Sequence, residues 1–378
     1  MPALTRDFDV IVTGSGPGGA YLSFLLASSG IKTLLIEKKS FPRYKTCGGG
    51  LTGRAKKILP FEIKEVVEDE TRVAMIGLNG KYLCRIKTQE PMIYMVMRDK
   101  FDLLLSSLAQ KNGASILFET AFHTFIESKG RIAVSTSKGD FRSNVLVGAD
   151  GVHSRVRKAL DLHPLDATPA LEAEVFDKDH EKKYHSTVHF DFGKVPEGYA
   201  WIFPKKDHLS IGVFSTRKKC SALKKHLHDY LLEKGLKNAK IASLKGHLIP
   251  IGPQRENIFA RKNVILLGDA AGLADPVTGE GIYHALKQAE MASGCIKKYL
   301  SGDIETLDSY NTLIRNEFVR ELKYARHLSY LLYRIPWLSH WALKRKGEKI
   351  MGYYLDVITG KRTYGELFLK ALNPLNLL

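Results

Sequence analysis

The chain has 378 residues, of which 44% are hydrophobic and 26% charged, so it can form two closely packed domains with ordinary globular cores. Its formal net charge of +17 at pH 7 indicates a surface that meets an anionic partner, namely a substrate, a lipid or a nucleic acid. No helix-turn-helix, zinc-finger or RNP-type motif accompanies this charge, so we expect no nucleic-acid partner.

The cysteines and histidines give no sign of a metal centre. The four cysteines lack C-x-x-C spacing, and the thirteen histidines include no H-E-x-x-H pair, so we predict no metal. Residues 10–31 carry no charge, but glycines interrupt them, and the apolar helical part is shorter than the ~20 residues of a membrane span. Because the N-terminus lacks the pattern of a secretory signal, we expect a cytoplasmic protein.

Residues 9–37 predict a strand, a tight turn, a helix and a second strand that ends in an acid. The turn contains Gly14, Gly16, Pro17, Gly18 and Gly19. Gly14 allows the sharp turn, Gly16 lets a pyrophosphate approach the backbone, and Gly19 lets the helix lie close to the strand. The helix N-terminus offers free N–H groups to phosphate, and Glu37, 23 residues after Gly14, can accept hydrogen bonds from a ribose. We predict dinucleotide binding, with the choice between FAD and a nicotinamide left to later motifs.

A glycine-rich loop follows at Cys47, Gly48, Gly49 and Gly50. Consecutive glycines disfavour helix and strand interiors, so we interpret this segment as a loop that faces a ligand rather than as a flexible linker. Further on, an apolar run over residues 92–97 precedes a helix to about Asn112, for which Asp99 is the expected N-cap. Arg98 should then lie just outside the helix, where it can reach a cofactor phosphate.

The next apolar run, over residues 145–147, ends at Gly148 and leads through Asp150 into a basic helix, which predicts a loop at the cofactor phosphates. Residues 165–250 then change character, because alternating apolar runs indicate an antiparallel sheet with one lysine-rich helix. The chain returns to the nucleotide fold with a strand that ends at Asp269. A following helix begins near Gly281 and Ile282, and its N–H groups suit negative charge.

The last segment, residues 318–378, is basic and has a helical apolar stripe. It contains eleven Lys and Arg against four Asp and Glu, together with Trp337 and Trp341. Phe318, Leu322 and Ala325 begin the stripe. Such a surface can lie on anionic lipid at the inner face of the membrane, and it can equally be a helical cap that packs on the rest of the protein.

These motifs, in this order, resemble the flavoprotein superfamily of p-hydroxybenzoate hydroxylase, and within it the geranylgeranyl reductase family. The wider resemblance rests on the Gly14–Gly19 turn with Glu37, on Arg98-x-x-Phe101-Asp102, on Asp150-Gly151 and on Gly268-Asp269 with the proline and glycines that follow. The narrower one rests on the C-G-G-G segment that starts at Cys47 and on Tyr199-x-Trp201-x-Phe203-Pro204. Flavin halogenases carry W-x-W-x-I-P at the second motif, so the resemblance disfavours halogenation.

The resemblance implies an α/β fold: a Rossmann-type FAD-binding domain with an inserted antiparallel β-sheet substrate domain and a C-terminal helical segment. We assign residues 1–164 and 251–317 to the FAD-binding domain, residues 165–250 to the substrate domain and residues 318–378 to the helical segment. The first of these ranges has room for early strands of the substrate sheet. For FAD we predict contacts by the following residues: Gly14, Gly16, Pro17, Gly18, Gly19, Glu37, Cys47, Gly48, Gly50, Arg98, Asp150, Asp269, Gly281 and Ile282.

The implied reaction is the reduction of isolated C=C bonds in a polyprenyl lipid or diphosphate by reduced FAD. An unpolarised alkene needs a proton as well as a hydride in a dry site, and we assign catalytic roles to Cys47, Tyr199 and Trp201. Electrons can come from NAD(P)H or from a ferredoxin-like protein. Two alternatives stay open: a flavin monooxygenase of a hydrophobic substrate, and a non-catalytic flavin carrier at the membrane surface.

Overall fold

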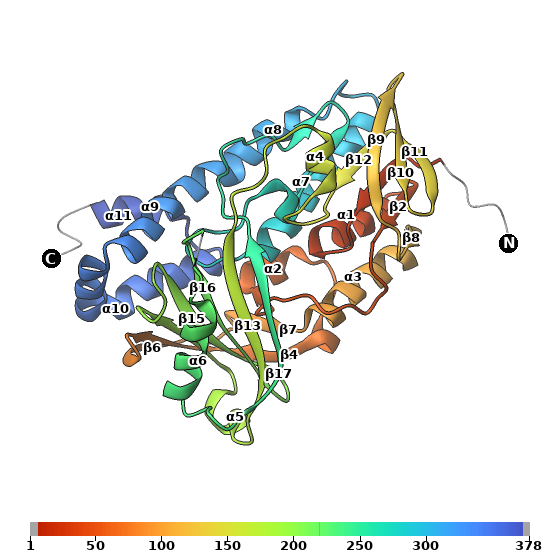
Figure 1. Cartoon of the computed structure of the whole chain (residues 1–378). Coiled ribbons are helices and arrows are strands. Elements are labelled where there is room, and N and C mark those ends of the chain that lie inside the picture. The colour runs from red at the N-terminus through yellow and green to blue at the C-terminus, as the bar shows by residue number, and fades with distance from the viewer. Residues whose placement is uncertain (1–6, 219, 373–378) are drawn as a thin grey trace.

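The computed structural model describes residues 7–218 and 220–372, and Figure 1 shows its two main sheets side by side. One is a six-stranded sheet that is parallel except at one edge strand. Its order is β18 (Ala260–Arg261), β19 (Val264–Leu266), β12 (Val145–Gly148), β1 (Val10–Thr13), β2 (Thr33–Ile36) and β8 (Ser115–Leu117). Every residue of β1, β2 and β12 is buried, as expected for parallel strands covered on both faces.

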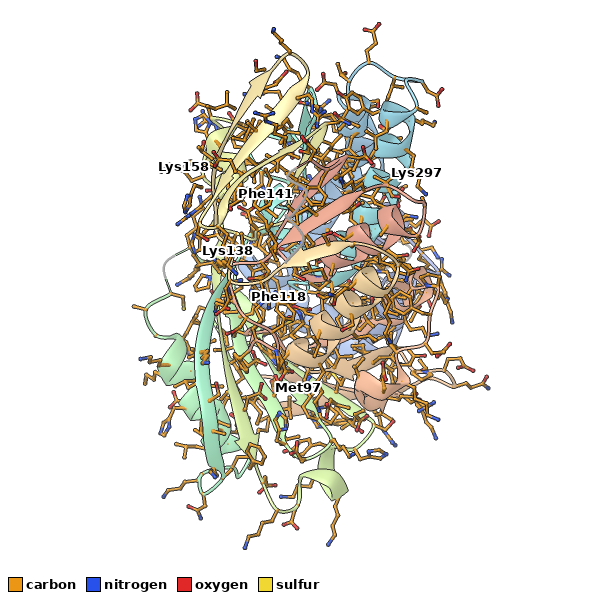
Figure 2. All side chains as sticks on the ribbon, turned by 90° about the vertical axis from the view of Figure 1, so that its right-hand side faces the viewer. Met97, Phe118, Lys138, Phe141, Lys158 and Lys297 are labelled. Carbon is orange, nitrogen blue, oxygen red and sulfur yellow. The ribbon has the colours of Figure 1, made fainter. Side chains whose placement is uncertain are left out.

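Three helices pack together on this parallel sheet: α1 (Pro17–Ala27), α3 (Arg98–Lys111) and α7 (Ile282–Leu300). A three-stranded antiparallel sheet also packs against it, formed by β9 (Phe122–Ser128), β10 (Arg131–Thr136) and β11 (Gly139–Ser143). Phe141 of β11 is buried and its ring contacts Phe8, whereas Lys138 at the β10–β11 turn lies at the surface and donates to the Phe118 carbonyl oxygen (Figure 2). The short helix α4 (Arg155–Ala159) follows β12.

The second large sheet has seven strands, all antiparallel to their neighbours except for the parallel pair β5 and β14. Its order is β17 (Lys240–Ile249), β13 (Thr168–Phe176), β16 (Leu209–Ser215), β15 (Gly198–Pro204), β14 (Thr187–Phe192), β5 (Val73–Leu78) and β6 (Lys81–Lys87). Helix α6 (Leu223–Glu233) and the short α5 (His180–Tyr184) contact this sheet. Strands β5 and β6 precede residue 165, so the sheet draws on two separate parts of the chain.

A small sheet joins these two bodies. It consists of β3 (Gly50–Thr52), β7 (Ile93–Val96) and β4 (Val67–Thr71), with α2 (Gly53–Ile58) and the 3-10 turn Lys64–Val66 beside it. Because β3 begins at Gly50, this sheet fixes the end of the glycine-rich loop that follows Cys47.

The C-terminal part is helical as far as it is described, which confirms the predicted helical segment for residues up to 372. It comprises α8 (Ser309–Ile314), a π-helical turn (Arg315–Val319), α9 (Arg320–Arg334), α10 (Pro336–Ile358) and α11 (Tyr364–Leu372), which run from the top of Figure 1 at α8 to its left side. Phe318, Leu322 and Ala325 are buried, so the start of the apolar stripe packs on the protein body. No helix in the described ranges is both long and apolar enough to cross a membrane.

Candidate functional site

The glycine-rich turn between β1 and α1 is shaped by close contacts of its backbone. Gly14 has φ +92°, and a Cβ there would clash with the Ala149 carbonyl oxygen; a Cβ at Gly19 would clash with the carbonyl oxygen of Gly14. A Cβ at Gly16 would meet only Arg98 Nη2, at 3.9 Å, so the space in front of the helix N-terminus is open. Gly18 faces the other way, since its Cβ would lie 2.6 Å from Leu267.

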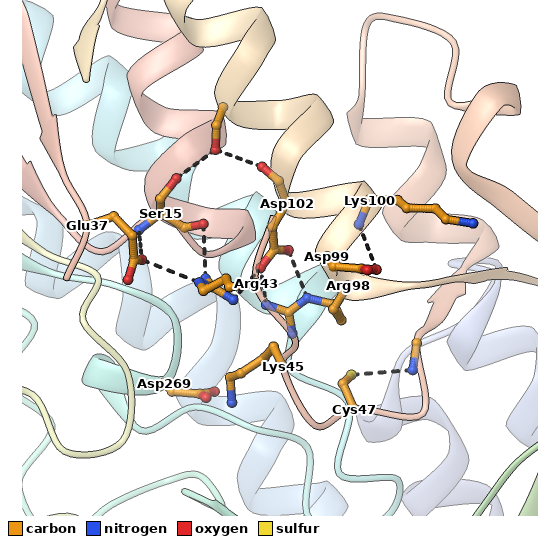
Figure 3. A network of polar contacts seen from close by, with 12 residues as sticks. Ser15, Glu37, Arg43, Lys45, Cys47, Arg98, Asp99, Lys100, Asp102 and Asp269 are labelled. Carbon is orange, nitrogen blue, oxygen red and sulfur yellow. Dashed lines mark hydrogen bonds and ion pairs between the residues drawn. The ribbon is translucent and has the colours of Figure 1, made fainter. Parts of the chain in front are cut away.

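Glu37 reaches this turn from the end of β2. Its Oε2 accepts a hydrogen bond from the Ser15 N–H at 3.0 Å, and its Oε1 accepts one from the Lys39 N–H at 3.0 Å. The Arg43 guanidinium lies between two carboxylates, with Nε 3.6 Å from Glu37 Oε2 and Nη1 3.2 Å from Asp102 Oδ2 (Figure 3). Three charged side chains therefore line the edge of the turn.

Arg98 corrects one prediction. It is the first residue of α3, not a residue outside the helix, and the N-cap position is held by Met97. Asp102 serves the ion pair rather than a capping box: Arg98 Nε and Nη2 donate to its two carboxylate oxygens, both at 2.8 Å. Both side chains are buried, and the bidentate pair holds the guanidinium beside Gly16.

Asp150 lies at the end of β12, next to Gly14. Its Oδ2 accepts the backbone N–H groups of Arg155 at 2.7 Å and Val156 at 3.3 Å, so the carboxylate caps the start of α4. The Oδ1 atom is buried and has no hydrogen-bond partner within the described part of the chain. Burial raises the pKa of this carboxyl group. A buried oxygen without a partner is costly, so its position fits a site for a donor from a ligand.

Asp269 follows β19 and lies at the N-terminus of α7. One carboxylate oxygen is 3.5 Å from the position of a Cβ at Gly281. Its Oδ2 lies 3.9 Å from His247 Nε2, and Lys45 Nζ lies 2.5 Å from that same nitrogen. Burial raises the pKa of Asp269, but the contact with His247 and the charge of Lys45 outweigh it and lower the pKa. Burial lowers the pKa of Lys45 to about 8.

The Cys47 loop lies flat against aromatic rings. A Cβ at Gly48 would be 2.9 Å from the Phe203 ring and 3.2 Å from Trp201 Nε1, so only glycine allows this approach. The Cys47 N–H donates to Glu172 Oε2 at 2.7 Å, and its Sγ accepts the Gly49 N–H at 3.4 Å (Figure 3). The thiol is therefore held at a fixed place beside the aromatic strand.

The aromatic strand is β15, in which Tyr199, Trp201 and Phe203 point to one face, with successive rings tilted to one another and their centroids 6.0 Å apart. Tyr199 and Trp201 are both buried. The Tyr199 hydroxyl donates to the Thr278 carbonyl oxygen in the loop before α7, whereas Trp201 Nε1 is buried without an acceptor in the described ranges. We call the rings of Tyr199, Trp201 and Phe203 the aromatic wall; it reaches from the Cys47 loop to the loop before α7.

The predicted residues form two neighbouring groups. Gly14, Gly16, Glu37, Arg98 and Asp150 lie at the ends of parallel strands β1, β2 and β12 or beside them, and Cys47, Tyr199 and Trp201 lie at the seven-stranded sheet. Residues 43–47 run between the groups. The open space at Gly16 and the unpartnered Asp150 Oδ1 fit an elongated cofactor with phosphates and hydroxyls, and FAD is such a molecule.

Sequence reasoning did not identify several ionisable residues of this site: Arg43, Lys45, Glu172, Lys205 and His247. Arg43 and Lys45 could have been predicted, because they lie in the same loop as Cys47. Glu172, Lys205 and His247 belong to no motif, and they come from strands or strand ends that the fold brings to the loop. Within residues 7–218 and 220–372, no group of three His, Cys, Asp or Glu could hold a metal ion.

Comparison with known proteins identifies relatives along most of the chain. A family profile described as FAD binding domain matches residues 7–322. The chloroplastic geranylgeranyl diphosphate reductase of Arabidopsis thaliana is 30% identical over 77% of this chain, which covers 66% of that relative's length. The digeranylgeranylglycerophospholipid reductase of Methanothrix thermoacetophila is 28% identical, with 85% of each protein covered.

A solved structure has the same architecture. It is a geranylgeranyl bacteriochlorophyll reductase-like protein of Thermoplasma acidophilum, which superposes with a TM-score of 0.80 over 97% of this chain and 96% of its own. At 24% identity, this likeness establishes the shared fold and nothing about the substrate.

Proposed function

We propose that this chain, which belongs to the FAD-binding domain family of FAD-dependent oxidoreductases, reduces isolated carbon–carbon double bonds of a polyprenyl lipid or diphosphate. The observation that carries the proposal is the Cys47 loop packed flat on the aromatic face of β15, next to the nucleotide-binding turn. This arrangement offers a thiol and a dry apolar wall at one place. The relatives named for geranylgeranyl and digeranylgeranyl substrates support the same substrate class.

FAD would be held by the residues predicted for it. Gly14 to Gly19 and the α1 N-terminus suit the pyrophosphate, Glu37 suits the adenosine ribose, and Arg98 adds a positive charge. Asp150 and Asp269 offer carboxylates to hydroxyl groups, and the α7 N-terminus at Gly281 and Ile282 suits negative charge on a reduced flavin. Reduced FAD, when bound, supplies the hydride for the alkene.

The residues of this chain would supply the proton and the dry surroundings. Cys47 can hold a proton at Sγ, and the Gly49 N–H fixes that atom in place at 3.4 Å. Tyr199 and Trp201 exclude water and orient the alkyl chain against the loop. Burial raises the pKa of Tyr199, so its hydroxyl stays protonated and hydrogen-bonded to Thr278.

The electron source and the location are further parts of the proposal. NAD(P)H or a ferredoxin-like protein would reduce the flavin. We propose a cytoplasmic protein that contacts an anionic membrane. Support for the contact comes from Tyr330, Trp337 and Trp341, which are 55%, 74% and 40% exposed where α9 meets α10. Cationic Arg345 lies beside Trp341. Sedimentation with anionic vesicles tests this contact, and a Trp337→Ala/Trp341→Ala variant should sediment less.

One experiment tests the reaction. The FAD-loaded protein is reduced chemically without oxygen and mixed with geranylgeranyl diphosphate, and flavin absorbance is followed beside product mass. We expect the flavin to reoxidise with a gain of two hydrogens for each reduced double bond. Cys47→Ala should slow this step more than tenfold, since proton donation commonly contributes that much or more, while Cys220→Ala should not.

Other outcomes would favour the alternatives. A flavin that stays reduced until air enters, and then gives a product heavier by one oxygen, would identify a monooxygenase. Bound FAD without turnover of any polyprenyl compound, and without an effect of Cys47→Ala, would identify a flavin carrier.

A further inference from the structure

A pocket of about 330 Å³ lies outside the site described above, between the seven-stranded sheet and the C-terminal helices. One side comes from the β14–β15 connection, including Glu197, and from Arg217 just after β16. The other side comes from the end of α9 and the first turns of α10, including Arg334 and His340. The pocket is large enough for the polar end of a lipid or for a small ligand.

Two arginines converge in this pocket on one carboxylate. Arg217 Nε lies 2.8 Å from Glu197 Oε1, and Arg334 Nε lies 2.8 Å from Glu197 Oε2. Glu197 is largely buried, whereas both arginine side chains are about half exposed. Each guanidinium uses Nε in this contact, and its Nη groups form no hydrogen bond or ion pair within the described part of the chain. Planar Arg forks of this kind bind phosphate oxygens in pairs.

The helix at the pocket adds to its positive potential. Helix α10 begins at Pro336, and its first turns bring His340 to the pocket, so the positive end of the helix dipole lies there. The single carboxylate of Glu197 neutralises only one of the two guanidiniums of Arg217 and Arg334, so this trio has a net positive charge. Burial, together with nearby Lys344, lowers the pKa of His340, so that its neutral ring offers a hydrogen bond rather than a charge.

The inner side of the pocket is apolar, and its residues belong to the same buried cluster as Tyr199 and Trp201 of β15. Phe192, Tyr333 and Leu343 are all buried, and they line the pocket. The Phe192 ring lies 6.4 Å from Tyr333 and 6.1 Å from Tyr199, counted between centroids. From there the rings of β15 lead to the Cys47 loop.

The length of β15 gives the distance between the pocket and the Cys47 loop. Gly198, the first residue of β15, lines the pocket, and Phe203 lies against Gly48. At ~3.3 Å per strand residue, these ends are roughly 17 Å apart, a distance that a chain of several isoprene units spans. The pocket and the thiol therefore stand at two ends of one apolar row.

We propose that this pocket binds the phosphate or diphosphate end of a polyprenyl substrate through Arg217 and Arg334, while the chain runs along β15 to the Cys47 loop. The proposal rests on the proposed function for its substrate class. It adds a second, anionic recognition point, which fixes how far along the chain a double bond lies from Cys47.

Binding, measured apart from turnover, tests this proposal. Isothermal titration of the FAD-loaded protein with geranylgeranyl diphosphate and with geranylgeraniol compares the same chain with and without phosphate. We expect Arg217→Gln and Arg334→Gln each to weaken diphosphate binding about tenfold, or about 1.4 kcal/mol, and to leave alcohol binding unchanged. Glu197→Gln should tighten diphosphate binding roughly threefold, because it removes the competing carboxylate.

Lys224→Gln and Lys349→Gln are matched controls. Each removes one positive charge from an exposed position outside the pocket, and neither should change binding. A general loss of net charge would affect all four cation variants alike and would overturn the proposal. So would equal effects on the diphosphate and the alcohol, or a loss of affinity in Glu197→Gln.

Competition assays identify the source of the phosphate, and a comparison of reduction with binding distinguishes failure of the pocket proposal from failure of the proposed function. Competition by inorganic pyrophosphate but not by glycerol phosphate identifies a free diphosphate as ligand, whereas the reverse identifies a phospholipid headgroup. If no polyprenyl compound is reduced but the arginine variants lose diphosphate affinity, the pocket stands and the reductase proposal falls. If reduction proceeds with equal diphosphate affinity in all variants, the pocket assignment falls alone.

Discussion

Lys205 donates a hydrogen bond to the carbonyl oxygen of Gly48 at 2.8 Å. Its side chain is only 3% exposed, and it directly follows the last residue of β15. The same ammonium donates to the Val96 carbonyl oxygen at 2.9 Å. One buried cation thus ties the Cys47 loop to the small sheet and to the aromatic strand. Burial lowers the pKa of Lys205, and the negative charge of Glu172 opposes that shift.

Lys205→Met should therefore destabilise the protein. It removes the ammonium donor from one buried and one part-buried carbonyl oxygen, at about 1–3 kcal/mol each, so we expect the free energy of unfolding to fall by roughly 2–6 kcal/mol. Urea denaturation followed by circular dichroism measures the change. Lys206→Met alters the exposed neighbour and should stay within about 0.5 kcal/mol of the wild type. Equal stability of the two variants would contradict the clamp.

Gly48→Ala tests the close approach of loop and rings. Its Cβ would lie 2.9 Å from the Phe203 ring, so the loop or the ring must move, and we expect turnover with a polyprenyl substrate to fall at least tenfold. Gly48 is itself a predicted FAD contact, so FAD content is read from flavin absorbance and turnover is compared per bound FAD.

Gly294→Ala is the matched control, since nothing lies within 4 Å of a Cβ in that helical position. It should retain activity and slightly raise the melting temperature, as Ala is the better helix former. Full activity in Gly48→Ala would show that the close contact has no part in the reaction.

The sequence predicted the local structure of those segments of the candidate site that carry a local pattern. The turn from Gly14 to Gly19 and the acid at Glu37 could be read because a tight turn needs glycine at fixed spacing, and the Cys47 loop because three glycines follow one another. The alternation of Tyr199 and Trp201 predicted that both side chains lie on one face of a strand.

Residues that act through tertiary contacts carried no such signal. Arg98 was expected outside its helix, because Asp99 is a good N-cap by type; the bidentate pair with Asp102, one helical turn on, instead favours Arg98 as the first helical residue. His247 comes from β17, at the edge of the seven-stranded sheet, and meets Lys45 only through strand order. No spacing along the chain encodes that pairing.

The Lys45 ammonium predicts a pH dependence of stability. Its pKa is about 8 in the folded protein against an ordinary 10.5, so between these values the unfolded chain binds more protons than the folded one. The free energy of unfolding should then rise with pH from 8 to 10.5, by up to ~1.4 kcal/mol per pH unit for one proton.

Other groups titrate in the same range, so the difference from Lys45→Met isolates this residue. We expect the wild type to gain stability relative to Lys45→Met as the pH rises from 8 to 10 in urea titrations. A constant difference across that range would show that Lys45 is not held with a lowered pKa.

Substitutions of Gly14 and Gly16, in the turn between β1 and α1, should distinguish an effect on folding from an effect on cofactor binding. A Cβ at Gly16 meets nothing closer than Arg98 Nη2 at 3.9 Å, so Gly16→Ala should unfold at nearly the wild-type urea concentration. The same Cβ occupies the space in front of the helix N-terminus where a pyrophosphate would approach, so the Kd for FAD should rise more than tenfold.

Gly14→Ala should lose both properties, because φ +92° and the clash with Ala149 strain any residue with a side chain, at a cost of at least about 2 kcal/mol. Flavin fluorescence quenching gives the Kd, and urea denaturation of the apoprotein gives the stability. If Gly16→Ala bound FAD as tightly as the wild type, the pyrophosphate would have to lie elsewhere, and the open space at this turn would have another explanation.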